Sequence, residues 1–80
     1  MAFNKEDNQF VINEHKKEIR KLRKQIKKND HTAYILSQCD EFTDEYVQSI
    51  AARNIPLNDR IEHLNDLINS LTKLERMLFS

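Results

Sequence analysis

Cationic side chains that could bind an anionic partner are concentrated in one short stretch, residues 15–28. This stretch contains eight Lys or Arg residues and a single acid, Glu18. Clustered cationic side chains suit the phosphates of a nucleic acid or the carboxylates of a protein surface. No aromatic residue lies among them to stack on nucleic-acid bases. We therefore predict that an acidic protein surface binds here, with Lys17, Arg20, Lys21, Lys24 and Lys28 as the contact residues.

Two other interpretations of the basic stretch remain open. Residues 1–30 carry nine cationic and five acidic side chains, a net charge of +4, whereas residues 31–80 carry four and eight, a net charge of −4. The stretch could thus be a solvated face balanced by the chain's own acids, which include Asp40, Glu41, Asp44 and Glu45. It could also make the chain a nucleic-acid-binding accessory protein. The net charges of the two halves cancel to zero, whereas a typical DNA-binding domain is basic overall.

Catalytic and metal-binding side chains do not form a convincing constellation. The acids at positions 40, 41, 44 and 45 form two i, i+4 pairs, but an outward helical face supplies no pocket for acid–base work. His15 has Glu18 on the same helical face and lacks further ligands at metal-binding spacing. Cys39 is predicted to lie on an apolar face as a small hydrophobic residue. We expect no catalytic residues, no metal and no cofactor, and hence no enzyme.

Two short motifs resemble known families. Leu22-Arg23 followed by Ile26, with Asp59-Arg60 after Pro56, resembles the helical chorismate mutases, which hold a dicarboxylate with arginines from several helices. The middle of this chain has acids where such an arginine is expected. Ser37-Gln38-Cys39-Asp40 resembles the Ser-Gln-x-x-Asp signature of small phosphatases that act on sporulation response regulators, with the aspartate one residue early. We assign the chain to neither family and keep a small helical phosphatase-like regulator as a third functional hypothesis.

The elements that must position these residues are all predicted to be helices. The sequence has no Gly and one Pro, and isolated Ile and Leu residues interrupt long charged stretches. This composition is typical of an all-α protein. The first helix is predicted over about residues 7–29. Its apolar seam has the three- and four-residue spacing of a coiled coil and comprises Ile12, His15, Ile19, Leu22 and Ile26.

Two breaks are predicted to divide the remaining chain. Asn29-Asp30-His31-Thr32 favours a turn, although a continuous helix through it is an alternative because Gly and Pro are absent. The segment 53–56 ends in Pro56, which disfavours helix at the preceding residue. We therefore expect helix 2 over about 32–53, with a wide apolar face from Ile35 to Ile50, and helix 3 over about 56–79.

These elements predict one small domain, residues 1–80, folded as a three-helix up-down-up bundle or a helical hairpin with coiled-coil-like seams. So short a chain buries little apolar surface, so we expect a homodimer formed through the seam of the first helix. The lone cysteine and the lack of a stretch that could span a membrane suggest a cytoplasmic protein without membrane contact. Its richness in Lys, Asn and Ile is typical of AT-rich bacterial or phage genomes. The function that we expect is that of a small non-enzymatic regulator or adaptor.

Overall fold

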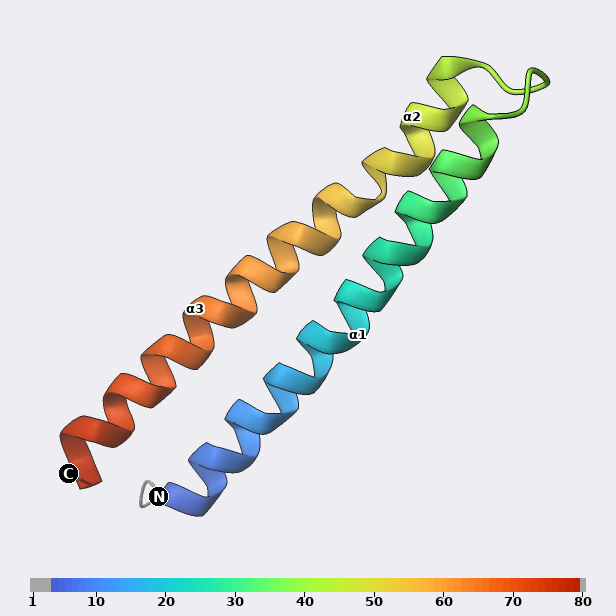
Figure 1. The fold of residues 1–80 in the computed structure, drawn as a ribbon. Coiled ribbons are helices and arrows are strands. Elements are labelled where there is room, and N and C mark those ends of the chain that lie inside the picture. The colour runs from blue at the N-terminus through green and yellow to red at the C-terminus, as the bar shows by residue number, and fades with distance from the viewer. Residues whose placement is uncertain (1–3, 80) are drawn as a thin grey trace.

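The computed structural model describes residues 4–79, which form a long helical hairpin (Figure 1). Helix α1 spans Lys5–Ser37, and the chain then returns as α2, Asp44–Ala52, and α3, Asn54–Phe79. Helices α2 and α3 run in nearly the same direction and together form the second arm (Figure 1). The molecule measures 59 × 20 × 15 Å. We call the end with the first and last described residues the open end and the end with the turn the tip.

No strand occurs within the described range, so the all-α class is confirmed, and the architecture is the hairpin rather than a three-helix bundle. The predicted break at residues 29–32 does not form, because α1 continues through it. The expected end of helix 1 at residue 29 and the start of helix 2 at residue 32 both fall inside α1. The first reversal of the chain comes instead at residues 38–43, which no predicted break covered.

The reason that helix persists at residues 29–32 lies in the other arm. Asn29 is buried, and its amide nitrogen donates to Oδ1 of Asn54 at 2.8 Å. Its own Oδ1 accepts a hydrogen bond from Gln25 at 3.0 Å, while Asp30 accepts one from Asn54 at 2.8 Å. Asn and Asp favour turns because their side chains compete for nearby backbone groups. Here side-chain partners across the hairpin satisfy them, so the competition is removed.

The starts of α1 and α2 carry side-chain caps. The side chain of Asn4 accepts hydrogen bonds from the backbone N–H groups of Glu6 and Asp7, at 2.8 and 3.4 Å. Thr43 does the same for the N–H of Tyr46 at 3.2 Å. Acidic residues in the first turn also interact favourably with the helix dipole, and both α1 and α2 have them. Local sequence thus accounts for where each of these helices begins.

The core is a narrow row of side chains between the two arms. Residues spaced alternately by three and four face across the hairpin, and Leu64 at its centre is completely buried. Burying such apolar side chains contributes about 1.5–3 kcal/mol each before the entropy cost. Asn8, Asn29 and Asn54 occupy three other buried positions of the same row. The buried apolar side chains are Ile12, Ile19, Ala33, Ile50 and Leu64.

The wide apolar face predicted for helix 2 does not form. Its residues are divided between the end of α1, the turn and α2, and only some of them face the other arm. Ile50 is buried, whereas Ile35 and Tyr46 are each 47% exposed. The ring of Phe42 stacks on that of Tyr46 with centroids 5.5 Å apart, which leaves an aromatic pair at the tip. The prediction assumed a helix packed between two neighbours, but each arm here has only one.

The second predicted break is present in a milder form. A single non-helical residue, Arg53, separates α2 from α3, and α3 begins at Asn54, before the predicted start at residue 56. Pro56 therefore lies in the first turn of α3, where its missing N–H leaves no hydrogen bond unmade. The chain does not reverse there. Among the described helices, none has both the length and the apolar character needed to cross a membrane.

Candidate partner-binding surface

All five predicted contact residues are exposed on α1, namely Lys17, Arg20, Lys21, Lys24 and Lys28. The four lysines follow one another at intervals of four, three and four residues, so they form a straight row along the helix. At 1.5 Å per residue, this row is about 16 Å long. The remaining member, Arg20, lies beside this row, three residues after Lys17. We call these five residues the basic patch.

The basic patch has almost no acidic partner within the described part of the chain. Its one ion pair there joins Lys17 to Glu14 at 3.5 Å, between side chains that are 63% and 49% exposed. The acids that could have balanced the patch lie around the tip, in the turn and the first turn of α2. No ion pair within residues 4–79 connects them to the patch. These acids are Asp40, Glu41, Asp44 and Glu45.

A groove that shares Arg20 with the patch adds residues outside the predicted contact set. Lys16, Arg20 and Arg23 line it from α1, and Asn65 lines it from α3. Ile19 and Ile68 complete the lining. The groove thus offers three cationic groups and one amide to an anionic ligand. No sequence signal identified Asn65, because its contribution depends on α3 lying beside this flank of α1.

The seam predicted for oligomerisation faces the second arm of the same chain. Ile12 and Ile19 are buried, while Leu22, Ile26 and His15 are half-buried. His15 also borders a second groove, together with Glu14, Lys17, Glu18, Lys21 and Arg60. There Arg60 of α3 forms an ion pair with Glu18 of α1 at 3.1 Å. Any contact of this seam with a second copy remains a prediction.

The Ser-Gln-Cys-Asp segment lies where α1 ends and the turn begins. Ser37 donates a hydrogen bond to the carbonyl oxygen of Tyr34 at 2.6 Å, and Gln38 is the C-cap residue. Cys39 is exposed, so the expectation that it would lie on an apolar helical face is wrong. Asp40 is in the turn and not on a helical face with Ser37. Across residues 4–79, no three His, Cys, Asp or Glu side chains come together as a possible metal site.

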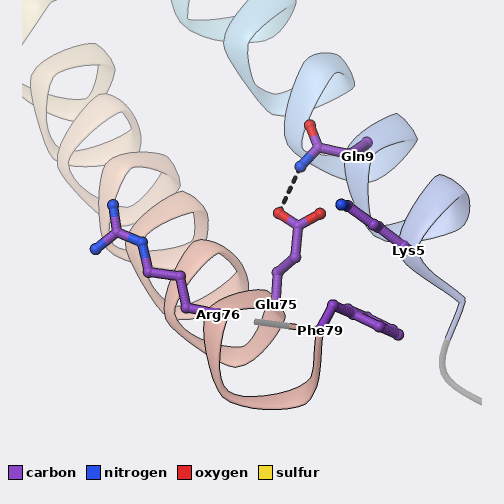
Figure 2. Close-up of a pocket in the computed structure, with 5 residues that line it drawn as sticks. All are labelled: Lys5, Gln9, Glu75, Arg76 and Phe79. Carbon is purple, nitrogen blue, oxygen red and sulfur yellow. Dashed lines mark hydrogen bonds between the residues drawn. The ribbon is translucent and has the colours of Figure 1, made fainter.

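The open end has a pocket between the first turns of α1 and the last turns of α3. Figure 2 shows Gln9 donating a hydrogen bond to Glu75, with Lys5, Arg76 and Phe79 also at the pocket. Glu75 is half-buried, and its Oε1 is a buried atom without a hydrogen-bond partner among residues 4–79. Nearby, Asn8 donates to the carbonyl oxygen of Leu71 at 3.2 Å. These contacts close the open end with polar groups.

The comparisons with known proteins give no relative from which a role could be transferred. No protein-family model matches this chain, and neither a curated protein nor a solved structure is significantly similar to it. The function must therefore be argued from the geometry alone.

Proposed function

We propose that this protein is a small non-enzymatic regulator or adaptor that binds an acidic protein surface through the basic patch of α1. The observation that supports this proposal most is the lack of acidic partners for the patch within the described chain. Four of its five members have no ion pair there, and Lys17 has only the exposed Glu14. A rod that presents a straight cationic row fits an acidic helix or ridge on another protein.

Energetics support the same proposal. Lys17 with Lys21, and Lys24 with Lys28, are like-charge pairs at i, i+4 on α1, and each such pair destabilises a helix by about 0.2–0.5 kcal/mol. Glu in place of the first lysine of each pair would have made the interaction attractive and stabilised the helix. Binding an acidic surface offsets the repulsion, and complementary charge also accelerates association.

The test is a charge reversal compared with a matched control. The variant Arg20→Glu/Lys24→Glu should keep the helix content of the wild type but lose capture of the native partner. The control Lys5→Glu/Arg53→Glu changes the net charge equally at residues outside the patch, and it should retain capture. Circular dichroism and affinity capture followed by mass spectrometry provide the measurements. Normal capture by the patch variant would contradict the proposal, and its unfolding would show that the patch stabilises the chain itself.

The second candidate is a nucleic-acid-binding accessory protein, favoured by the groove lined by Lys16, Arg20, Arg23 and Asn65. Cationic groups on a groove can follow a phosphate backbone, and such binding weakens steeply with salt. A mobility-shift assay on a generic duplex at two salt concentrations separates the candidates. Tight binding that Lys16→Glu/Arg23→Glu removes, and that added salt weakens, would favour nucleic acid.

The third candidate is a phosphatase-like regulator of a response regulator, based on the Ser-Gln-Cys-Asp segment alone. A hydrolase would need Gln38 and Asp40 held together against a phosphorylated aspartate. Both are exposed near the turn. Incubation with a phosphorylated receiver domain, monitored for phosphate release, tests this candidate directly. We expect no release above background.

A further inference from the structure

Helix α3 carries a second row of residues that does not face α1. Leu67, Ser70, Leu74 and Met77 follow one another at intervals of three, four and three residues, so they share one flank of the helix. Leu67 is half-buried, Leu74 is 37% exposed and Met77 is 71% exposed. This row is therefore an apolar surface that the hairpin leaves largely uncovered.

The flank of α1 that lies beside this row can be identified from an ion pair. Arg60 precedes Leu67 by seven residues, and residues seven apart occupy nearly the same side of a helix. Arg60 pairs with Glu18 of α1, and Val11 lies seven residues before Glu18. Val11, which is 39% exposed, therefore extends the same flank at the open end. Leu67, Ser70, Leu74, Met77 and Val11 form what we call the apolar flank.

We propose that the apolar flank packs against the same flank of a second copy of this chain, with the two α3 helices antiparallel. Such a contact is two-fold symmetric, so each copy contributes the same residues. If the helices cross near Ser70, Leu67 of one copy lies opposite Leu74 of the other, and the small Ser70 side chains allow close approach. The helices overlap over about 18 residues, or roughly 27 Å.

The charges beside the apolar flank favour a second copy in this orientation. Asp66 and Lys73 lie on its outer edge, each one residue before a leucine of the row. In the antiparallel pair, each Asp66 lies beside Lys73 of the other copy, so two opposite-charge contacts form. A parallel two-fold pair would place the two Asp66–Lys73 edges on opposite sides of the contact, so neither charge would meet a partner. The surface is therefore complementary to itself only when the helices run in opposite directions.

The first test introduces a charge into the apolar flank. Light scattering coupled to size exclusion at micromolar concentration should show a dimer for the wild type. Leu74→Glu should raise the dimer dissociation constant by at least about 100-fold, because a carboxylate would be buried without a partner. The matched control is Ile55→Glu, on the opposite flank of α3 and 63% exposed in the wild type, and it should remain dimeric. Circular dichroism checks that both variants keep their helices.

The second test determines the orientation. Asp66→Lys alone and Lys73→Glu alone each place like charges together in the antiparallel dimer, so each should weaken the dimer about tenfold. An equimolar mixture of these two variants should recover wild-type affinity as a heterodimer, because every contact is again between opposite charges. The double variant Asp66→Lys/Lys73→Glu should recover it as a homodimer. Parallel helices would give no such recovery.

A wild-type monomer at about 100 μM would overturn the proposal, because an interface of ordinary affinity is saturated at that concentration. A Leu74→Glu variant that remains dimeric would also overturn it, as would single charge variants that dimerise normally. A monomer would leave the flank available to an unlike partner. Dimerisation and capture of an acidic partner can be tested independently, because Arg20 and Lys24 lie outside the apolar flank. Arg20→Glu/Lys24→Glu should dimerise like the wild type.

Discussion

The two arms of the hairpin are alike on their inner sides and different on their outer sides. On the inner side, each arm presents residues at three- and four-residue intervals, and both contribute fully buried or nearly buried side chains. On the outer side, α1 is strongly cationic, whereas α3 combines charges of both signs with most of the apolar flank. The difference shows that one packing pattern can support two unlike surfaces. Stability depends on the inner sides, and the contacts that we propose with other chains involve the outer ones.

The largest expected effect is on the inner side of either arm. Replacing the completely buried Leu64 by Ala, or the 5% exposed Ile19 by Ala, should each lower the free energy of unfolding by about 2–5 kcal/mol. The physical cause is lost burial plus a cavity. Urea unfolding followed by circular dichroism measures it, with the exposed Ile55→Ala as a control that should change stability by less than about 0.5 kcal/mol. Unequal costs for the two core variants would show that the arms are not equivalent.

A smaller effect is expected where the arms exchange hydrogen bonds. Asn54→Ala removes partners of Asn29 and Asp30 and should cost about 1–3 kcal/mol, since the buried amide nitrogen of Asn29 is left unsatisfied. In a double-mutant cycle, Asn29→Ala and Asn54→Ala should show a coupling of about 0.5–3 kcal/mol. If the losses in unfolding free energy of the two single variants simply add in the same urea titrations, the two amides contribute to stability independently.

The smallest expected effect is at the exposed ion pair that joins the arms. Arg60 and Glu18 have side chains that are 49% and 44% exposed, so solvent screens their attraction. Glu18→Gln should therefore cost less than about 1 kcal/mol. Thermal unfolding at low and high salt measures this, and the difference between the variant and the wild type should shrink as salt rises. A larger cost would place this pair among the determinants of the fold.

Local sequence was sufficient to predict several features because their causes are local. Helix follows from the absence of Gly and from the spacing of Ile and Leu. The seam positions from Ile12 to Ile26 follow from the same periodicity, and they face the other arm as amphipathic residues should. The discontinuity before Pro56 follows from the steric effect of proline. The exposure of the basic patch follows from its position away from the seam.

Other features were decided only by contacts between distant residues. Whether Asn29 ends a helix or continues it depends on Asn54, which lies 25 residues away. The location of the turn followed from that outcome, and with it the exposure of Cys39 and of the aromatic pair at the tip. The groove that joins Asn65 to Arg20 and Arg23 exists only because α3 lies against that flank of α1. Periodicity specifies which side of a helix is apolar, but tertiary packing determines which apolar and polar side chains find a partner.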